Sequence, residues 1–580
     1  MKQTDLETTS VADAYLALLA SRGVDYLFAN SGTDFAPLIE ALAKAEAEAG
    51  AGKVEQKYPQ PMLVPHENVA VAMAHGYYMA TGRVQAVMVH VGLGTANAIN
   101  GLYNAARQNV PILFTAGRTP ILESGLPGSR NNYINWAQEL FDQAAMVREL
   151  MKWDYELRHP LQLETVVDRA LALATSEPQG PVYLTLPREV LAAASDGRQP
   201  GTNTTIAAAT PPHADPAAIA QLANWLRAAR APLIITSSAG RQTSAATALG
   251  ALAQRLAVPV VQYRPRYLCL PTTHAMHSGF DATPLLPDAD LVLVLESDVP
   301  WIPEQAAPNT ACKVVHLGVD PLFARYPIRG FRADLAITGE VTGALAQLDL
   351  ALQNVDDDYR RRIEARRRTV AEFRAKTGLT AERMTRAPAA MSGKWVSRCI
   401  DDICDADTIL INEYPLVLEE LQCVKPGNYF SHSPAGGLGW ATGAALGVKL
   451  ARPDKTVIAA IGDGAYMFGN PTPAHFVSRA AGLPVLFVVF NNRRWGSVHR
   501  STITAYPGGH AARAEQPPLS CLEPSPDYEK IVEASGGYGE CVSDPAQLPA
   551  ALQRALHAMR VEKRQALLNV QLEINYTRTS

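Results

Sequence analysis

Apolar residues along the chain gather in short continuous runs that alternate with stretches of helical periodicity. The runs form three groups: 26–29, 84–90, 112–116 and 182–186, then 233–236, 258–263, 291–296 and 314–317, and last 408–412, 457–461, 485–490 and 566–571. Runs that are apolar at successive positions and separated by helices are typical of parallel strands covered on both faces. The pattern therefore predicts an α/β fold with three doubly wound parallel-sheet domains.

Two interruptions in this pattern place the domain boundaries. Residues 199–212 are rich in Thr, Ala and Pro and predict a linker after the first domain, and residues 356–368 are densely charged and predict a bridge after the second. We expect acid–base pairing along a solvated helix in that bridge, rather than an anion site built from its arginines. The domains are predicted at residues 1–195, 213–350 and 385–575.

Composition narrows the class of protein. Of the 580 residues, 47% are hydrophobic and 19% are charged, as in ordinary soluble globular proteins. The net charge of −4 argues against nucleic acid as an obligate partner, and there is no run of 18 apolar residues that would predict a membrane span. The seven cysteines are scattered without metal-ligand spacing, and residues 12–23 predict a first helix rather than a signal segment. We therefore expect reduced thiols and a cytoplasmic location.

The third domain carries its clearest chemical signal where two strands end. Gly462-Asp463-Gly464 follows one apolar run, Asn491-Asn492 follows the next, and residues 471–481 predict the crossover helix between them. Right-handed crossovers bring the ends of parallel strands to one edge of the sheet, where ligands bind in open α/β folds. A carboxylate, amide oxygens and approachable backbone N–H groups suit a Mg2+ ion that clamps a diphosphate. The alternative is a pair of unrelated turns, because Gly, Asp and Asn are common in turns.

The spacing of these residues resembles the thiamine-diphosphate motif, in which GDG is followed some two dozen residues later by NN. The resemblance implies that the side chains of Asp463 and Asn492 and the backbone carbonyl of Arg494 ligate Mg2+. Backbone N–H groups after the aspartate would face the phosphates, and a tryptophan beside the metal loop would border the substrate site. The cofactor-binding residues at these strand ends and loops are predicted to be Asn412, Gly462, Gly464, Ala465 and Trp495.

A second motif, in the first domain, supplies the acid that such a cofactor needs. Glu67 lies in the first turn of an Ala-rich helix after the strand-like residues 62–64, in a segment that resembles the H-E-x-x-A-x-x-M-A-x-G-Y pattern of acetolactate-synthase-like enzymes. The resemblance implies that Glu67 bonds N1′ of the aminopyrimidine ring and so promotes loss of the proton from C2 of the thiazolium ring. A tuned carboxylic acid in apolar surroundings suits that role. The alternative is that Glu67 has no such role and that the helix dipole favours an acidic residue in the first turn.

Residues Gly436-Gly437-Leu438-Gly439 resemble the loop that bends the coenzyme in the same enzymes. The resemblance implies that the carbonyl of Gly436 accepts from N4′ and that the side chain of Leu438 lies between the two rings. An ordinary buried leucine is the alternative for Leu438. With these segments the resemblance covers nearly the whole chain, and it is to the thiamine-diphosphate-dependent decarboxylase and acetohydroxyacid synthase superfamily.

This resemblance has consequences for partners and for other cofactors. In that family the first and third domains that share one cofactor come from different subunits. The resemblance therefore implies a homodimer at minimum, and often a homotetramer, with Glu67 of one chain facing Asp463 of the next. Some relatives hold FAD or a nucleotide in the central domain. We do not favour FAD here, because residues 233–241 lack a G-x-G-x-x-G fingerprint, although relatives bind FAD without one.

Residues 89–98 resemble the benzoylformate decarboxylase loop H-x-x-x-G-T-x-N-A. In that match His90 takes the place of an active-site histidine, Thr33 that of an active-site serine, and His274 or His277 that of a second histidine from the central domain. A histidine titrates near neutrality, so His90 would serve as a proton shuttle. The alternatives stay open: His90 as a strand-end histidine bonded to backbone, and His274 and His277 as structural residues.

The chain is therefore predicted to be a Mg2+- and thiamine-diphosphate-dependent enzyme that breaks or forms a C–C bond of a 2-oxo acid. Decarboxylation, carboligation or both are expected, as in acetolactate-synthase-like enzymes. The alternative on the same scaffold is a 2-hydroxyacyl-CoA lyase or a cyclic diketone C–C hydrolase. Residues 506–526 predict either a lid over the site or a plain surface loop.

Overall fold

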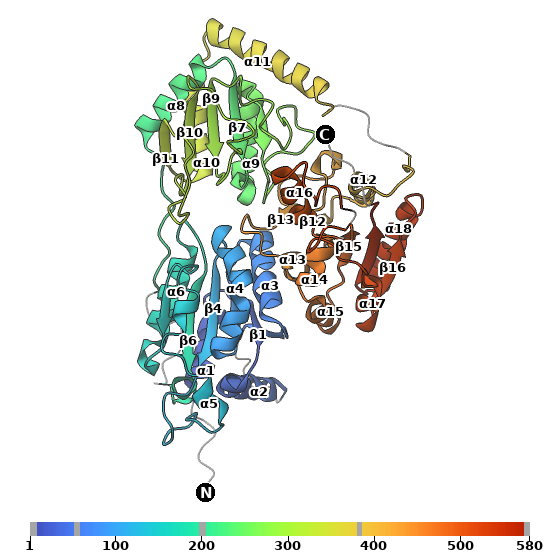
Figure 1. The fold of residues 1–580 in the computed structure, drawn as a ribbon. Coiled ribbons are helices and arrows are strands. Elements are labelled where there is room, and N and C mark those ends of the chain that lie inside the picture. The colour runs from blue at the N-terminus through green and yellow to red at the C-terminus, as the bar shows by residue number, and fades with distance from the viewer. Residues whose placement is uncertain (1–8, 51–57, 196–204, 380–385, 515, 574–580) are drawn as a thin grey trace.

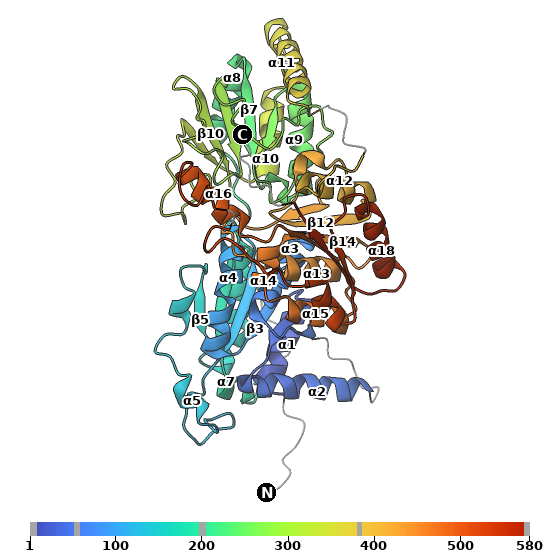
Figure 2. The ribbon, with the colours of Figure 1, turned by 45° about the vertical axis from the view of Figure 1, so that its right-hand side comes forward.

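The computed structural model describes residues 9–50, 58–195, 205–379, 386–514 and 516–573. Three all-parallel sheets follow one another along the chain, and buried apolar side chains cover both faces of each sheet. The first and central domains lie at opposite ends of the molecule, and the third packs beside the first (Figures 1 and 2). The predicted fold class, three parallel α/β domains, is confirmed.

The first domain is built on a six-stranded sheet with the order β2-β1-β3-β4-β6-β5. Its strands are β1 (Tyr26–Asn30), β2 (Gln60–Leu63), β3 (Gln85–Val89), β4 (Ile112–Arg118), β5 (Asp154–Glu156) and β6 (Val182–Pro187). Its helices are α1 (Val11–Ser21), η1 (Thr33–Phe35), α2 (Ala36–Gly50), α3 (Glu67–Thr81), α4 (Val91–Arg107), α5 (Ile134–Ala137), η2 (Ala144–Met146), η3 (Pro160–Gln162), α6 (Leu163–Thr175) and α7 (Arg188–Ala192). The strand order reverses direction between β1 and β3, and ligands of such sheets bind at the carboxyl ends of the strands there.

The central domain has a five-stranded sheet with the order β11-β10-β9-β7-β8. Its strands are β7 (Pro232–Thr236), β8 (Val260–Gln262), β9 (Leu291–Leu295), β10 (Lys313–Gly318) and β11 (Leu335–Thr338). Its helices are α8 (Pro216–Ala228), η4 (Ala239–Arg241), α9 (Thr243–Leu256) and α10 (Val341–Ala351). The reversal of strand order falls between β7 and β9.

The third domain has a six-stranded sheet with the order β13-β12-β14-β15-β17-β16. Its strands are β12 (Thr408–Glu413), β13 (Tyr429–Ser431), β14 (Thr456–Gly462), β15 (Leu486–Asn491), β16 (Tyr538–Val542) and β17 (Ala566–Gln571). Its helices are α12 (Gly393–Ile403), η5 (Leu418–Glu420), α13 (Trp440–Ala451), α14 (Asp463–Phe468), α15 (Pro471–Ala480), α16 (Gly496–Ala505), α17 (Tyr528–Ala534) and α18 (Leu548–Arg560). Because β12 pairs with both β13 and β14, the ligand-binding edge lies where β12 and β14 end.

The twelve strands predicted from apolar runs are present, with ends that differ by at most two residues, and the strand-like residues 62–64 overlap β2. Four strands lack a prediction: β5, β11, β13 and β16, which are three to five residues long. Each of the four is an edge strand of its sheet. Edge strands are commonly kept short, so these four lack the long apolar runs that mark the central strands.

Helices α3 and α13 join the first and third domains and lie side by side in Figures 1 and 2. A Cβ atom on Gly76 would overlap the backbone of Ala444, and one on Gly447 would overlap the carbonyl of Met73. The two helix backbones are therefore in direct contact. This contact merges apolar residues of both domains into one buried cluster.

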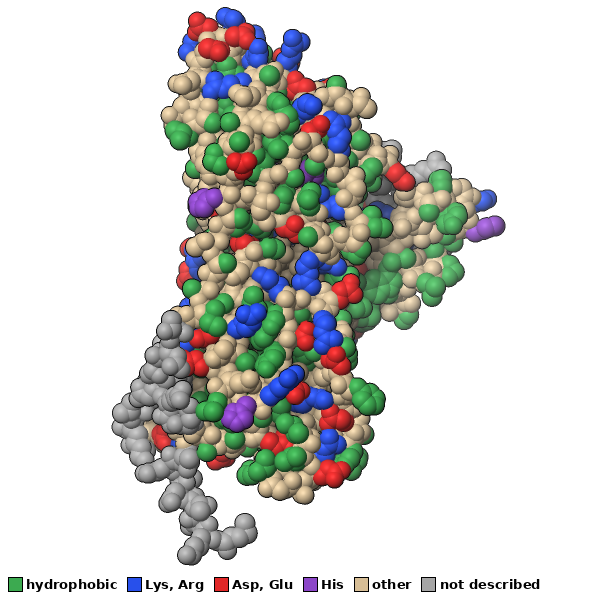
Figure 3. Space-filling model, turned by 90° about the vertical axis from the view of Figure 1, so that its left-hand side faces the viewer, with side chains coloured by type: hydrophobic (Ala, Val, Ile, Leu, Met, Phe, Trp, Pro, Cys, Tyr) green, Lys and Arg blue, Asp and Glu red, His purple; other side chains and the backbone are tan. Residues whose placement is uncertain are grey.

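The predicted charged bridge forms α11 (Asp357–Lys376), which lies against the outer end of the central domain. Its expected acid–base pairs are present: Arg360 contacts Asp357 at 2.7 Å, and Arg362 pairs with Asp358. Acidic and basic side chains accordingly mix at this end of the molecule (Figure 3). The predicted linker at 199–212 lies partly outside the described residues. None of the described helices has both the length and the apolar character needed to span a membrane.

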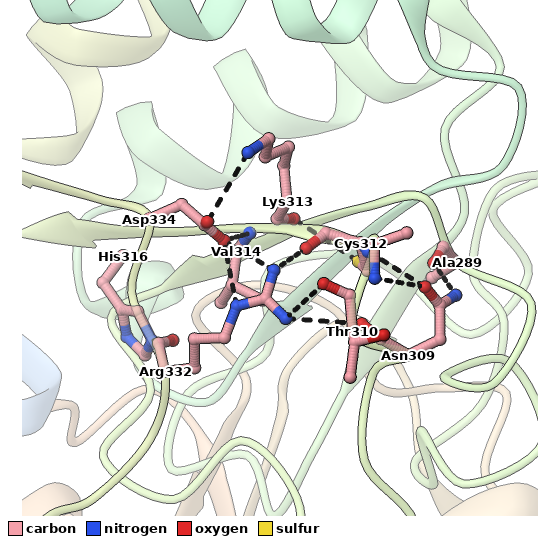
Figure 4. A network of polar contacts seen from close by, with 10 residues as sticks. Ala289, Asn309, Thr310, Cys312, Lys313, Val314, His316, Arg332 and Asp334 are labelled. Carbon is pink, nitrogen blue, oxygen red and sulfur yellow. Dashed lines mark hydrogen bonds and ion pairs between the residues drawn. The ribbon is translucent and has the colours of Figure 1, made fainter.

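A polar network fixes the start of β10 in the central domain (Figure 4). Asp334 accepts from the guanidinium of Arg332 at 2.9 Å and from the backbone N–H of Val314 at 2.8 Å. The side chain of Asn309 caps the preceding turn by accepting from the N–H of Cys312 at 2.9 Å. These partners are backbone or carboxylate groups within the domain, so the network is structural.

Candidate functional site

Glu67 begins α3 at the carboxyl edge of the first sheet. Its side chain is buried, and amides hold both carboxylate oxygens: Asn30 Nδ2 donates to Oε1 at 2.8 Å, and Asn97 Nδ2 donates to Oε2. Asn30 ends β1 and Asn97 lies on α4, so two elements fix the orientation of the acid. A buried carboxylate needs such donors. The structure therefore places an oriented acid where ligands of this sheet bind.

Helix α4 connects this acid to the third domain. Asn97, Asn100 and Asn104 share one face of the helix, because residues three and four apart are neighbours on its surface. Asn100 Nδ2 donates to the carbonyl of Leu438 at 3.1 Å, and Asn104 Nδ2 donates to that of Gly437 at 2.8 Å. The N–H of Gly437 donates back to Asn104 Oδ1 at 3.0 Å. One helix face thus holds the buried glutamate and, one to two turns further on, the glycine-rich loop.

Glycine is required in this loop for steric reasons. Gly436 and Gly439 have φ angles of +68° and +80°, which residues with a side chain rarely adopt. A Cβ atom on Gly439 would also overlap Gly469, so the loop approaches the end of α14 closely. Leu438 between them is half-buried and packs on the cluster shared by the two domains.

These contacts join the two predicted halves of the cofactor site within a single chain. The resemblance implies that the halves come from different subunits, whereas here the loop 436–439 meets α4 of its own first domain. The physical reason is the contact of α3 with α13, which docks the third domain on the first. The expected homodimer and homotetramer stay predictions.

His90 precedes α4 and is held by side chains rather than by backbone. Its Nδ1 is bonded to Asp34 Oδ1, and its Nε2 lies 3.1 Å from Nε2 of Gln138. Asp34 is only 3% exposed. The hydrogen bond to this buried carboxylate raises the pKa of His90, although desolvation opposes the shift. His90 therefore keeps its proton to a higher pH than an ordinary histidine.

The backbone around His90 is tightly packed and strained. The ring of His90 fills the space that a Cβ atom on Gly32 would need, and the carboxylate of Asp34 does the same at Gly117. Val91 has a φ angle of +33°, an outlier for a β-branched residue. Strained residues of this kind tend to cluster at functional sites.

The other predicted catalytic residues divide between two places. Thr33 is exposed beside the buried Asp34, and its carbonyl accepts from Arg188 Nη1 at 3.2 Å. His277 is buried in the central domain, 3.2 Å from Nε2 of Gln262, and burial lowers its pKa to about 3. His274 is half-buried in the same loop and accepts from a backbone N–H there. The structure does not bring His274 or His277 to the cofactor edge.

Asp463 begins α14 directly after β14 and is 2% exposed. Its Oδ2 has no hydrogen-bond partner among the described residues. Burial raises the pKa of Asp463 to about 6, although backbone N–H groups of Gly464, Arg493 and Arg494 oppose the shift. Buried polar atoms without a partner are rare, and a cation would supply one here. The donor set therefore fits a hard divalent ion such as Mg2+.

The two asparagines at the end of β15 differ in role. Asn491 is fully buried and donates to Ser525 and Asn569 at 2.9 and 3.0 Å, so it fixes the strand to its surroundings. Asn492 is half-buried, and its Oδ1 accepts from the N–H of Arg494 at 3.1 Å. This bond shapes the loop that carries two of the three predicted metal ligands, Asn492 and Arg494.

The remaining predicted cofactor residues lie around Asp463. Gly462 ends β14, Gly464 and Ala465 are in the first turn of α14, and the ring of Trp495 packs against Gly464. The N–H of Trp495 donates to the carbonyl of Ser520 at 2.9 Å. The segment predicted as a lid or a loop is therefore attached to the metal loop near residue 520.

Two groups at the end of β12 also shape the site. Glu413 is buried, and its carboxylate accepts from the N–H groups of Gly439 and Ala441 at 2.7 and 2.6 Å, which braces the glycine-rich loop. Burial raises its pKa to about 7. The amide of Asn412 donates to the hydroxyl of Tyr429 at 2.9 Å and accepts from a backbone N–H, so this predicted cofactor residue is engaged within the sheet.

A tyrosine–histidine pair stands beside the same loop. The rings of Tyr414 and His432 are 3.8 Å apart, and the Tyr414 hydroxyl is 2.8 Å from the Cβ position of Gly436. Tyr414 has a φ angle of +80° and is 46% exposed. Burial lowers the pKa of His432 to about 4, so it is neutral at physiological pH. His432 thus lies beside the loop 436–439 and belongs to the third domain, not to the central one.

Sequence reasoning gave no role to several of these groups. They lie at a strand end, in or next to a short helix, or on one helix face: Asp34, Asn97, Asn100, Asn104, Gln138, Glu413, Tyr414 and His432. Asn97 belongs to the motif at residues 89–98, and the helical spacing of the three asparagines was a further signal. Nothing local marks the others.

Comparisons with known proteins agree with this geometry. Residues 9–146 match the model "Thiamine pyrophosphate enzyme, N-terminal TPP binding domain", residues 219–348 the central domain and residues 414–570 the C-terminal TPP binding domain of the same family. The acetolactate synthase isozyme 3 large subunit of Escherichia coli (strain K12) is 24% identical, over 96% of this chain and 93% of its own length. Benzoylformate decarboxylase of Pseudomonas aeruginosa is 26% identical, over 95% of this chain and 97% of its own length.

A solved structure shows the same fold. The thiamine diphosphate-dependent 4-hydroxybenzoylformate decarboxylase of Rhodococcus jostii RHA1 superimposes with a TM-score of 0.77 at 21% identity, over 98% of this chain and 100% of that chain. The three family models follow one another in the order of the three sheets. The chain therefore belongs to the thiamine pyrophosphate enzymes, as a thiamine-diphosphate-dependent enzyme of the decarboxylase and acetolactate synthase type.

Proposed function

We propose that this chain uses Mg2+ and thiamine diphosphate to break or form the C–C bond next to the carbonyl of a 2-oxo acid, by decarboxylation, carboligation or both. The observation that carries the proposal is the asparagine face of α4, which bonds Glu67 and the loop 436–439 together. The acetolactate synthase and benzoylformate decarboxylase among the relatives support this reaction class. A cytoplasmic homodimer or homotetramer belongs to the same proposal.

The residues present fit the cofactor, because the orphaned Oδ2 of Asp463 lacks the cation that the motif would hold. Bound thiamine diphosphate would supply a nucleophilic carbon and a positively charged ring that takes up the electrons of the breaking bond. Glu67 would hold the aminopyrimidine nitrogen, and Asp463 and Asn492, with the carbonyl of Arg494, would hold Mg2+. The carbonyl of Gly436 completes the set on the ring side.

The side chains around Glu67 determine which groups of the site can donate or accept a proton. The bond to Asp34 raises the pKa of His90, so His90 suits the role of proton donor on the first-domain side of the site. His432 is neutral and lies beside the loop on the third-domain side. A histidine with a raised pKa and a neutral histidine on opposite sides suit a reaction that moves a proton on and off one carbon.

FAD is not part of the proposal. At the strand-order reversal of the central sheet, Arg266 is bonded to both carboxylate oxygens of Asp298 at 2.7 and 2.8 Å. This ion pair lines a cavity together with Arg241 and Glu296. Part of the position is therefore taken by side chains of the domain itself.

The proposal is tested by incubating the purified protein with Mg2+ and thiamine diphosphate against pyruvate, branched-chain 2-oxo acids, phenylpyruvate and benzoylformate. Carbon dioxide and organic products are measured for the wild type and for Glu67→Gln, with the exposed Glu40→Gln as a matched control. We expect release of carbon dioxide that Glu67→Gln loses and Glu40→Gln retains. An aldehyde product would indicate a decarboxylase, and an acyloin or acetolactate-type product a ligase.

If the protein binds the cofactor but turns over no 2-oxo acid, the proposal is wrong. The alternative is then a 2-hydroxyacyl-CoA lyase or a cyclic diketone C–C hydrolase on the same scaffold. Cleavage of a 2-hydroxyacyl-CoA or of a cyclic 1,2-dione, again with Glu67→Gln as the control, decides between them.

A further inference from the structure

A segment of the central domain crosses to the third sheet and brings an arginine with it. Tyr267 pairs with Phe430 of β13 in an antiparallel bridge, and the N–H of Ser431 donates to the backbone of the same segment at 3.0 Å. Strand residues on the two sides advance in opposite directions from such a bridge. Continuing this register places Arg264 just beyond the carboxyl end of β13, at the edge where the coenzyme-bending loop begins.

Arg264 has no structural ion pair to explain its place. Its side chain is exposed and forms no salt bridge with any described residue. Two residues further on, Arg266 is buried and bonded to both oxygens of Asp298. Arg264 also has a φ angle of +45°, a strained conformation that persists only where the surroundings impose it. The fold therefore holds an uncompensated guanidinium at this edge.

The groups around Arg264 are polar rings rather than acids. Burial raises the pKa values of Tyr414 and Tyr429 and lowers that of His432, and the positive charge of Arg264 acts on all three in the lowering direction, so all three lie within its electrostatic reach. The nearest carboxylate on β12, that of Glu413, is already bonded to N–H groups at the start of α13. Arg264 thus lies near Tyr414 and His432, the pair beside Gly436, and forms no salt bridge with a carboxylate of the described residues.

We propose that Arg264 binds a second anionic group of the substrate, so that the preferred substrate is a 2-oxo dicarboxylic acid. This inference rests on the proposed function and names its substrate class. The carboxylate next to the carbonyl loses its charge as it leaves, so a cation that held it would stabilise the ground state more than the transition state. A guanidinium pairs with a planar carboxylate through two parallel N–H···O bonds. Arg264 therefore suits the carboxylate at the far end of the substrate.

The test compares 2-oxoglutarate with 5-methyl-2-oxohexanoate, which has a similar shape and an uncharged end. Kinetics are measured for the wild type, Arg264→Gln and Arg264→Lys, with Arg368→Gln on the exposed face of α11 as the matched control. We expect Arg264→Gln to lower kcat/KM for 2-oxoglutarate about tenfold or more, mainly through KM, and to leave the uncharged substrate unchanged. Arg264→Lys should recover part of the loss, and Arg368→Gln should behave as the wild type.

A second readout does not depend on turnover. Arginines of the wild-type protein are labelled with phenylglyoxal in the presence and absence of glutarate, and labelled peptides are identified by mass spectrometry. We expect glutarate to protect Arg264 and not Arg368. The inference is wrong if Arg264→Gln weakens both substrates equally, or if glutarate gives no protection. Failure of every 2-oxo acid with the wild type, despite protection of Arg264, would overturn the proposed function and leave the anion site in place.

Discussion

At the scale of single residues, two buried carboxylates set the charge of the site in opposite ways. Asp34 is paired, and it raises the pKa of His90. Asp463 has an oxygen without a partner, and burial raises its own pKa to about 6. A paired carboxylate stabilises a charge, whereas an unpaired buried one is stabilised by protonation or by a cation. Each case leads to a separate measurement.

Replacing Asp34 by Asn removes the group that raises the pKa of His90. His90 then loses its proton at a lower pH, so we expect the alkaline limb of the pH–kcat/KM profile to move to lower pH. The pair also contributes stability that is fully present below the ordinary pKa of histidine and is lost as the pH rises through the raised value. Asp142→Asn, which breaks an exposed ion pair with Arg148 in the same domain, is the control. An alkaline limb that stays in place would contradict the role of His90.

Asp463→Asn should stabilise the metal-free protein. Because the folded pKa of about 6 exceeds the ordinary value of 3.8, the folded state holds a proton that the unfolded state has lost, and stability falls as the pH rises through this window. At pH 7 the two-unit shift corresponds to about 3 kcal/mol. We expect the variant to melt above the wild type at pH 7 without Mg2+, with a smaller difference at pH 5.

Addition of Mg2+ with thiamine diphosphate provides the contrast for that experiment. The cofactor and metal should raise the melting temperature of the wild type and leave that of Asp463→Asn nearly unchanged, because ligands stabilise only the state that binds them. Equal stabilisation of both proteins would mean that Asp463 does not ligate the metal.

A site residue could be predicted when its partners lie close to it in the sequence, and could not when they lie far away. Glu67 and Asp463 stand in local motifs, so their placement at strand ends could be inferred. The partner of Asn100 is Leu438, more than three hundred positions away, and no local pattern reveals such a contact. His274 was a candidate because of its segment, but the chain there folds back along β8, where the N–H of Val260 bonds the carbonyl of Met276. Only the preceding segment with Arg264 crosses to the site.

At the scale of elements, glycines decide how close two helices approach. Gly76, Gly443 and Gly447 lie at the contact of α3 with α13, and a Cβ atom on any of them would meet backbone or a side chain of the other helix. The motif resemblance marks α3 as the carrier of Glu67, yet it does not show that α13 packs against it. The central strands were predictable from apolar runs, whereas the contact surface of a small-residue helix leaves no such run in the sequence.

Gly447→Ala tests this contact. The added methyl group would overlap the carbonyl of Met73, and a backbone group cannot rotate away as a side chain can. We expect a loss of about 1–3 kcal/mol in the free energy of unfolding, and weaker binding of the cofactor because the loop 436–439 moves with α13. Thermal melts and cofactor titrations measure both. Gly330→Ala, with open space around its Cβ position, is the control, and equal melting of the two variants would show that the helices have room to separate.

At the scale of the whole molecule, the open question is which chain supplies each half of the site. In this structure α3 and α13 of one chain pack together, and α4 bonds the loop of the same chain. The family resemblance instead implies that the halves are exchanged between two chains. The same surfaces would meet in either case, because exchange of identical elements between protomers preserves every contact.

Mixing two inactive variants distinguishes a site built within one chain from a site shared between two chains. Glu67→Gln and Asp463→Asn are each defective in one half, so an exchanged dimer of the two contains one site with both halves intact. If the chains assort randomly, half of the dimers are mixed and one of their two sites is sound, which predicts recovery of about a quarter of the wild-type activity. We expect this recovery from the proposed dimer after the variants are unfolded and refolded together, with each variant refolded alone as the control. Activity that stays at the level of the single variants would mean that one chain builds each site by itself, through the contact of α3 with α13 seen here.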